Sequence, residues 1–192
     1  MDELLDSFTH ILTPTLPHLL SLFVHPPRGF PSEKTSLIII DSVSSVFAAA
    51  YPKSSESRLR LQGGEKRNDS AQWAANRRWG VAGQLLSKLG KIAATKNLAV
   101  VVINQTTTHL RGMTGAMLGS AISGSTWDSG IYNRIVLYRD MVTGADVLDI
   151  PETQALRFAA VLKAAGKAVD ESSAIDKVVP FAINIVRSHM PA

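Results

Sequence analysis

The residues Ser36-Leu37-Ile38-Ile39-Ile40-Asp41-Ser42 set the architecture expected for this chain. Consecutive aliphatic side chains predict a strand that is buried on both faces, as in the middle of a parallel sheet. Open α/β sheets bind their ligands at the carboxyl ends of the strands, and Asp41 stands at that end. An ionised carboxylate there needs a partner, and a hydrated magnesium ion on a nucleotide is one candidate. A side chain that caps the following helix is the simpler alternative, and the strand alone favours it.

Composition limits the class of protein. The chain has 192 residues, enough for one domain with a core, and its 45% hydrophobic and 19% charged residues are typical of globular proteins. The net charge of +4 permits binding to nucleic acid without requiring it. The absence of cysteine excludes disulfides and thiolate metal sites. The apolar run from Leu19 to Val24 is too short to span a membrane, so we expect a soluble intracellular protein.

A second apolar run, Leu98 to Ile103, ends in Asn104-Gln105. A long helical pattern over 73–96 lies between the two runs, so the sequence predicts a β-α-β unit with parallel strands. Asp41 and Gln105 would then lie at the same edge of the sheet.

Further elements are expected before and after this unit. A strand over 8–12 precedes a helix that begins near Thr13, and a short helix follows Asp41. Strands without helices between them are expected over 133–139, 157–163 and 177–184, which predicts antiparallel pairing. The fold class is therefore α/β, with a mostly parallel sheet and an antiparallel C-terminal end.

Polar stretches flank the predicted edge. Residues 53–72 have the composition of a mobile loop, and from Lys53 to Arg78 seven basic residues stand against three acidic ones. Residues 106–126 are rich in Gly, Ser, Thr and Met and are long for a loop in a compact domain; such loops are usually functional or disordered. A basic mobile loop can bind phosphate, but such runs are often only solvated, and this composition favours neither alternative.

The order of these landmarks resembles that of a known family. The Ile-Ile-Ile-Asp41-Ser42 strand end is followed by a basic loop, a long helix, a strand ending in Asn104-Gln105, a Gly-rich loop and a strand from Asn133. This order is similar to the second half of the RecA-fold ATPase core of eukaryotic and archaeal strand-exchange recombinases and their paralogues. The resemblance implies a single domain over 1–192, with a core of about 8–185, that is a partial RecA-like P-loop NTPase core.

The resemblance also implies roles for individual residues. Asp41 corresponds to the Walker B carboxylate that holds Mg²⁺ through water, with Ser42 beside it, and Gln105 to the glutamine that senses the γ-phosphate of ATP. Residues 53–72 and 106–126 correspond to two mobile loops that bind single-stranded DNA. The candidate DNA-binding residues are Lys53, Arg58, Arg60, Lys66, Arg67, Arg111 and Arg134. Trp127 is expected to be a core residue rather than a platform for a base.

The chain departs from the family in the part that binds phosphate. No G-x-x-x-x-G-K-[ST] motif occurs in it, and the stretch from Gly29 to Thr35 lacks the second glycine and precedes a strand. The Walker A lysine is a main phosphate ligand of such enzymes, so the Walker A half is expected upstream of Met1, and this chain alone is expected not to hydrolyse ATP. The first loop also lacks a residue-for-residue match to the recombinases, which indicates a divergent paralogue.

The implied function is DNA repair by homologous recombination in the nucleus, by a paralogue that binds single-stranded DNA and, when complete, ATP. Its partners would be recombinase or recombinase-paralogue subunits. Two alternatives stay open: a non-enzymatic assembly subunit of a recombination mediator complex, and another RecA-fold ATPase, such as a helicase-like protein. A P-loop encoded upstream of Met1 would separate the ATPase paralogue from the assembly subunit.

Overall fold

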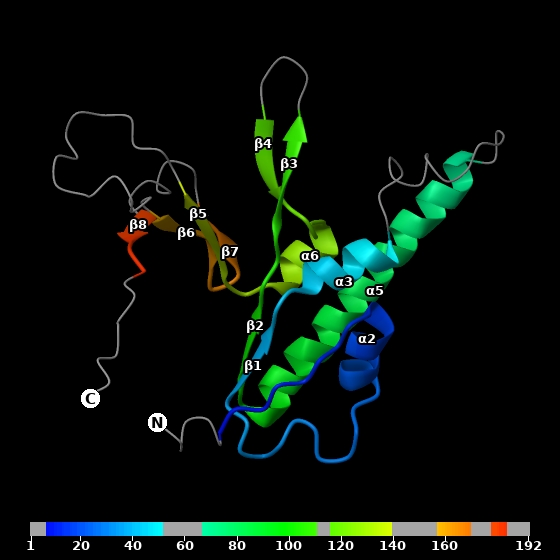
Figure 1. Cartoon of the computed structure of the whole chain (residues 1–192), viewed down its shortest axis with the longest axis vertical. Coiled ribbons are helices and arrows are strands. Elements are labelled where there is room, and N and C mark those ends of the chain that lie inside the picture. Colours follow the sequence, from blue (N-terminus) through cyan, green and yellow to red (C-terminus); the bar gives the residue numbers. More distant parts are fainter. Residues whose placement is uncertain (1–6, 52–66, 111–115, 140–156, 170–177, 184–192) are drawn as a thin grey trace, which may run out of the picture. The chain divides into compact units, whose positions relative to one another are not determined.

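The computed structural model of the chain describes residues 7–51, 67–110, 116–139, 157–169 and 178–183 (Figure 1). These residues form a mixed α/β structure with two compact units, Met1–Gly130 and Ile131–Ala192. The single domain expected over 1–192 stays a prediction. Among the described residues, the helices are all too short or too polar to cross a membrane.

The first unit contains the predicted β-α-β unit. Strands β1 (Leu37–Ile40) and β2 (Ala99–Val102) pair in parallel, with Leu37 opposite Ala99 and Ile40 opposite Val102. The parallel pair and the long helix between its strands are therefore confirmed. The other elements of this unit are α2 (Leu16–Val24), α3 (Val43–Ala50), α5 (Arg67–Lys96), β3 (Thr106–Leu110), β4 (Ala116–Ser120) and α6 (Ser125–Gly130).

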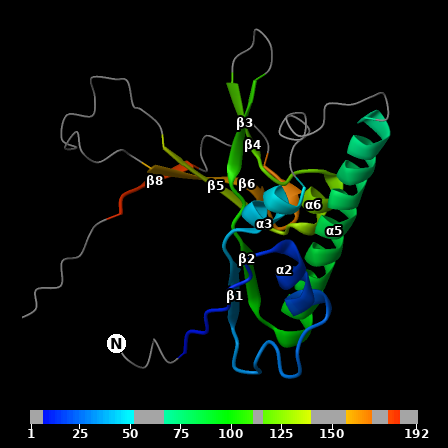
Figure 2. The ribbon, with the colours of Figure 1, turned by 45° about the vertical axis from the view of Figure 1, so that its right-hand side comes forward.

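The helices cover one face of the β1–β2 pair. Figure 2 shows α2, α3 and α5 on the same side of the two strands. The side chains buried there are mostly aliphatic and aromatic, and they include Leu16, Leu19, Phe23, Ile40, Val43, Phe47, Ala82, Leu85 and Leu89. Successive side chains of a strand point to opposite faces, so every second side chain of β1 and β2 points toward the helices. The core therefore lies between the sheet and the helices.

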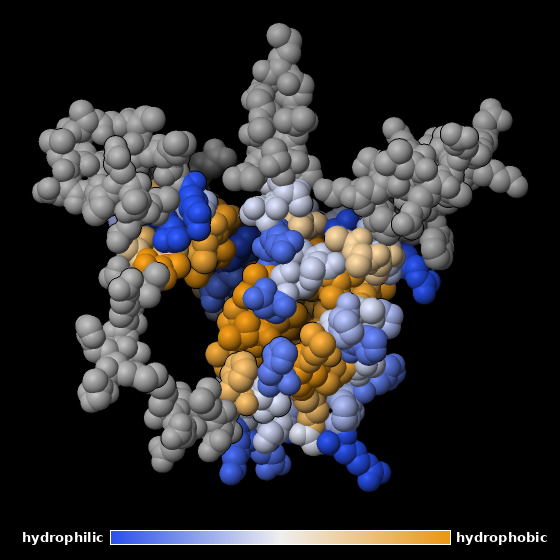
Figure 3. Space-filling model, viewed as in Figure 1, coloured by the Kyte–Doolittle hydropathy of each residue, from blue (hydrophilic) through white to orange (hydrophobic). Residues whose placement is uncertain are grey.

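The other face of the pair is open in the part of the chain that the structure describes. Leu37, Ile39, Val101 and Ile103 are between 41% and 55% exposed. Figure 3 shows a broad hydrophobic patch where β1 and β2 lie in Figure 1. The sequence predicted strands buried on both faces, and this is wrong for the described residues because their helices all lie on one side.

Residues 106–126, expected as a loop, are mostly regular structure. Strands β3 and β4 form an antiparallel hairpin in which Thr106 pairs with Ser120 and Leu110 with Ala116. Pairing gives the backbone groups of this stretch the hydrogen bonds that a long loop would leave to water. The helix α5 also begins earlier than expected, at Arg67, so the end of the predicted loop 53–72 is helical. The rest of that loop lies outside the described ranges, and the mobility of both stretches stays a prediction.

The N-terminal segment differs from expectation. The strand expected over 8–12 is absent, and Phe8 and Leu12 are 69% and 77% exposed. An apolar run becomes a strand only where another strand is available for pairing, and none of the described strands pairs with it. Helix α2 begins at Leu16, after Thr15 and with Pro17 in its first turn, close to the predicted start.

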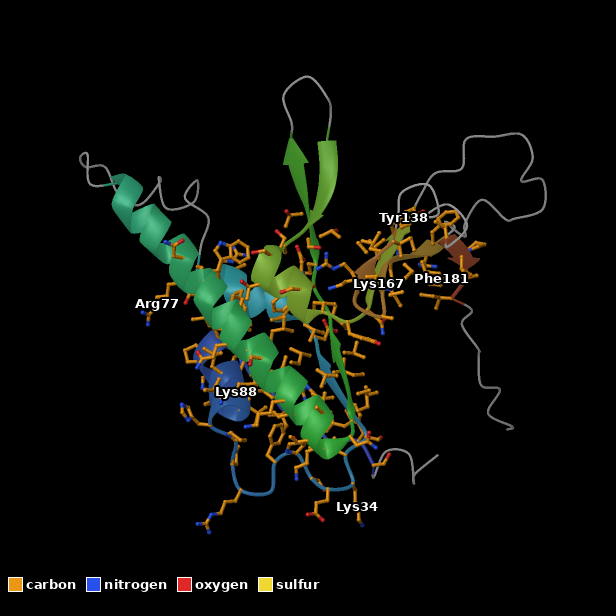
Figure 4. The ribbon with its side chains drawn as sticks, turned by 180° about the vertical axis from the view of Figure 1, so that it is seen from behind. Lys34, Arg77, Lys88, Tyr138, Lys167 and Phe181 are labelled. Carbon is orange, nitrogen blue, oxygen red and sulfur yellow. The ribbon has the colours of Figure 1, made fainter. Side chains whose placement is uncertain are left out.

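The second unit is an antiparallel sheet, as predicted. Its strands are β5 (Arg134–Arg139), β6 (Arg157–Ala164), β7 (Lys167–Ala168) and β8 (Val178–Phe181). Strand β6 pairs with the other three. Ala165 and Gly166 connect β6 to β7 with φ of 49° and 77°, the left-handed conformation that two-residue hairpin turns require. Tyr138 stacks on Phe158 with ring centres 5.4 Å apart, and Figure 4 labels Tyr138 within this sheet.

Candidate functional site: the β1–β2 edge and the hairpin root

Asp41 and Gln105 lie at the same edge of the parallel pair. Asp41 directly follows β1, Gln105 follows β2 after Asn104, and both side chains are exposed. Backbone hydrogen bonds continue the pairing past the strands: Ile103 N–H donates to the Ile40 carbonyl at 2.9 Å, and Val43 N–H donates to the Ile103 carbonyl at 3.1 Å. The peptide bond between Asp41 and Ser42 is cis. The pairing thus brings together the strand ends that the sequence singled out.

Ser44 joins the two strand ends through its hydroxyl. It is only 3% exposed, accepts a hydrogen bond from Gln105 N–H at 3.0 Å and donates one to the Ser42 hydroxyl at 3.3 Å. A hydroxyl can do both at once because it has one donor and two acceptor positions. The sequence analysis missed Ser44, since a serine early in a helix gives no periodic or charge signal.

Asn104 holds the returning arm of the hairpin. Its Nδ2 donates to the Ile122 carbonyl at 2.8 Å, and its Oδ1 accepts from Ile122 N–H at 3.2 Å. The neighbouring Ala121 N–H donates to the Gln105 carbonyl at 2.8 Å. Ile122 itself is fully buried. These bonds close a polar ring at the base of β3 and β4, which we call the hairpin root: Asn104, Gln105, Ala121 and Ile122.

Helix α5 contacts the hairpin root from the side. Arg78 Nη2 donates to the Ala121 carbonyl at 2.8 Å. Trp79 packs against Gly124, where a Cβ atom would lie 3.1 Å from the ring. Trp127, in α6, is 3% exposed, which confirms its predicted place in the core. The edge, the hairpin root and α5 are therefore joined by hydrogen bonds and packing within the first unit.

The candidate DNA-binding residues are spread over the chain. Arg67 begins α5 in the first unit, and Arg134 begins β5 in the second unit and is half-buried. The remaining candidates lie outside the described ranges: Lys53, Arg58, Arg60, Lys66 and Arg111. Contact of these residues with DNA stays a prediction.

Metal binding at the edge depends on few protein ligands. Within the described ranges, no three His, Cys, Asp or Glu side chains gather in a group that could hold a metal ion. Asp41 and the Ser42 hydroxyl supply oxygen atoms, the ligand type that Mg²⁺ prefers. Mg²⁺ is commonly held by one or two carboxylates together with waters and substrate phosphates. The residues present therefore fit a magnesium ion that arrives with a nucleotide, not one held by the protein alone.

Comparison with known proteins finds a relative. The chain is similar to the DNA repair protein rhp55 of Schizosaccharomyces pombe (strain 972 / ATCC 24843). The two are 27% identical over an alignment of 203 positions, which covers 84% of this chain and 57% of rhp55. The chain therefore spans little more than half the length of this relative, and the likeness, although weak, extends over most of the chain. No family model matches the chain.

Proposed function

We propose that this chain is a divergent recombinase paralogue that acts in DNA repair by homologous recombination in the nucleus. The observation that carries the proposal is the edge of the β1–β2 pair, where Asp41, Ser42 and Gln105 meet and from which the hairpin β3–β4 departs. The likeness to rhp55, which is named a DNA repair protein, supports the same role. The arrangement fits the second half of a RecA-like ATPase core.

The edge has the groups that such a core uses for nucleotide. Asp41 would hold Mg²⁺ through water, with Ser42 beside it, and the side-chain amide of Gln105 would contact the γ-phosphate of ATP. Bound Mg²⁺–ATP supplies concentrated charge, which a carboxylate and an amide at this edge can recognise. The exposure of Asp41 and Gln105 leaves both side chains accessible to a ligand.

Hydrogen bonds connect this edge to the hairpin. The backbone N–H of Gln105 donates a hydrogen bond to the Ser44 hydroxyl, and the backbone carbonyl of Gln105 accepts one from Ala121 N–H. A ligand that displaces Gln105 therefore changes hydrogen bonds on both sides of this residue, one of which belongs to the hairpin root. A local change of this kind can order or release a segment, which is how nucleotide state would alter DNA binding by residues 106–126.

A non-enzymatic assembly subunit is the second candidate. The open apolar face of β1–β2, formed by Leu37, Ile39, Val101 and Ile103, favours it, because contiguous exposed apolar surface marks protein interaction sites. In either role the partners would be recombinase or recombinase-paralogue subunits.

The test is a fluorescence anisotropy titration of a labelled single-stranded oligonucleotide at two salt concentrations. We expect weak binding that falls steeply with salt, by about 0.7 in log K per log unit of salt for each phosphate contact. The quadruple variant R58A/R60A/K66A/R67A should bind more weakly and with a smaller salt slope.

The matched control removes the same charge elsewhere. Lys34, Lys88, Lys91 and Lys96 lie away from the hairpin, and Figure 4 labels the first two of them. Their replacement by alanine should change the affinity far less than the loop variant does. Equal affinities of the loop variant and the wild-type chain would contradict the assignment of DNA binding to residues 53–72.

A further inference from the structure

We propose that Arg78 is a positioning residue that fixes the hairpin root to helix α5. The hydrogen bond from Arg78 Nη2 to the Ala121 carbonyl spans 43 positions of sequence. The backbone N–H of Ala121 donates a hydrogen bond to the Gln105 carbonyl at 2.8 Å. Both polar groups of the Ala121 backbone are thus engaged, one by α5 and one by the segment that follows β2. Arg78 therefore couples the orientation of the hairpin to the longest helix of the unit.

Packing beside this bond supports the same attachment. Trp79 lies against Gly124, where an added Cβ would lie 3.1 Å from the ring and where the φ of +137° would strain any other residue. Further along α5, Gly83 faces Thr126, where an added Cβ would lie 2.9 Å from the methyl group. Helix α5 thus follows the chain from the hairpin root into α6. Packing alone permits sliding, whereas the directional bond from Arg78 fixes the register of this contact.

The surroundings of Arg78 indicate that this side chain contributes little to the overall stability of the fold. Its Nε is buried and has no hydrogen-bond partner in the part of the chain that the structure describes. A buried donor without a partner costs free energy, which offsets part of what the Nη2 bond contributes. The guanidinium lies 5.6 Å from the centre of the Trp79 ring, a contact that recovers part of that cost.

A methionine at position 78 would keep much of the packing and remove the unsatisfied donor. The loss of the Nη2 bond is offset in part by the removal of the buried Nε donor that has no partner among the described residues. The Ala121 carbonyl would nevertheless lose its bond to α5. Arg78→Met is therefore expected to leave the fold intact while it loosens the hairpin root.

The effect of this attachment on DNA binding rests on the proposed function, in which residues 106–126 bind single-stranded DNA. A hairpin held in one orientation loses less conformational freedom on binding than one that pivots about its root. Loss of the attachment should therefore weaken DNA binding beyond the effect of one missing positive charge.

Arg77 provides the matched control because it precedes Arg78 on the same helix. It is exposed, and Figure 4 shows its side chain pointing away from α5. Arg77→Met removes the same charge and adds the same side chain as Arg78→Met. Any difference between the two variants reports the place of Arg78 and not the charge of the protein.

The first measurement is amide hydrogen exchange of the full chain without DNA, followed residue by residue. In Arg78→Met we expect exchange at Ala121 and Ile122 to rise about fivefold or more, in line with the loss of one hydrogen bond. Exchange at Ala99, whose amide donates to the Ser36 carbonyl at the other end of the sheet, should not change. Arg77→Met should leave exchange at Ala121 and Ile122 close to that of the wild type, and Arg78→Lys, which keeps a donor, should restore part of the protection.

Equal exchange at Ala121 and Ile122 in Arg78→Met and Arg77→Met would overturn the proposal. A uniform rise that includes Ala99 would also overturn it, because it would show a general stabilising role. The second measurement is the affinity for a single-stranded oligonucleotide, which should be at least about threefold lower for Arg78→Met than for Arg77→Met. Equal affinities would overturn the link to DNA, and a wild-type chain that binds no DNA would contradict the proposed function while the exchange result still decides the attachment.

Discussion

Ser44 has a structural role that its chemistry alone does not reveal. Its hydroxyl is almost fully buried and connects the backbone N–H of Gln105 to the Ser42 hydroxyl at the edge of the β1–β2 pair. The next residue, Ser45, is exposed and bonds only locally, to the Ser42 carbonyl at 2.7 Å. The two neighbouring serines therefore differ in role: Ser44 bonds to a distant segment of the chain, whereas the bond of Ser45 lies within one turn.

We predict that Ser44→Ala lowers the free energy of unfolding by about 1–2 kcal/mol, because it leaves the Gln105 amide without its buried acceptor. Ser45→Ala should change it by less than about 0.5 kcal/mol, as expected of an exposed position. Denaturant unfolding of both variants measures the difference. Equal losses in the two variants would show that Ser44 does not link the strands.

We also predict that the purified chain does not hydrolyse ATP. These 192 residues contain no Walker A motif, so the β- and γ-phosphates of ATP would lack their main charged ligand, and Asp41 alone would hold Mg²⁺ only weakly. Phosphate release should not exceed the background. Turnover that Asp41→Ala abolishes would contradict this prediction.

The sequence identifies candidate site residues only where a polar side chain directly follows a predicted strand. Asp41 and Gln105 could be predicted because a polar side chain follows an apolar run. Arg78 is one of several cations in a basic stretch, and its bond to Ala121 depends on the fold that brings together positions far apart in sequence. Asn104 was noted for its position, but its bonds to Ile122 depend equally on how the hairpin returns.

At the scale of elements, α5 combines tight and open positions along one helix. Gly124, in the turn before α6, has a φ of +137° and lies against Trp79 from α5. Gly90 is exposed within α5, and a Cβ atom there would meet nothing within 4 Å. The same substitution therefore has opposite consequences at these two glycines.

Gly124→Ala should destabilise the protein by about 1–3 kcal/mol through backbone strain and the clash with Trp79. Gly90→Ala should stabilise it by about 0.5–1 kcal/mol, since alanine is the better helix former at an unstrained position. Thermal and denaturant unfolding would show the two opposite shifts. A gain in stability for Gly124→Ala would contradict the described packing of α5 on the turn.

The elements that could be predicted are those with a strong apolar pattern. The parallel pair β1–β2 and the strands β5, β6 and β8 of the second unit follow from runs rich in aliphatic residues, whereas the two-residue strand β7 was not predicted. The hairpin β3–β4 was missed because Thr-Thr-Thr-His-Leu and Ala-Met-Leu-Gly-Ser lack a clear alternation, and pairing with a neighbour decides such cases. The start of α5 was missed because residues 67–72 have a polar composition that is common to helices and loops.

At the scale of the whole molecule, the open face of β1–β2 limits the behaviour of the isolated chain. An uncovered apolar sheet face promotes association, so we expect the chain alone to be marginally stable and to need additional sequence or a partner subunit for solubility. Size-exclusion chromatography with thermal melting tests this. A monodisperse monomer with a sharp, reversible transition would contradict it.

The double variant Ile39→Thr/Val101→Thr should reduce self-association with little loss of stability. Both side chains are about half exposed, and threonine keeps the β-branched shape that suits a strand. Ile40→Thr is the control, because Ile40 is 7% exposed on the covered face and its replacement should destabilise the fold. Unchanged association in the double variant, measured by sedimentation at several concentrations, would show that the open face is not the contact surface.

We propose that single-stranded DNA binds the protein through residues 53–72 and through the hairpin that leaves the edge of the β1–β2 pair. The decisive experiment is photo-crosslinking of the full chain to a bromodeoxyuridine-substituted oligonucleotide, with the crosslinked peptides identified by mass spectrometry. We expect crosslinks in peptides from residues 53–72 and 106–126. Crosslinks confined to α2 or to residues 157–183, or none above the unirradiated sample, would contradict it.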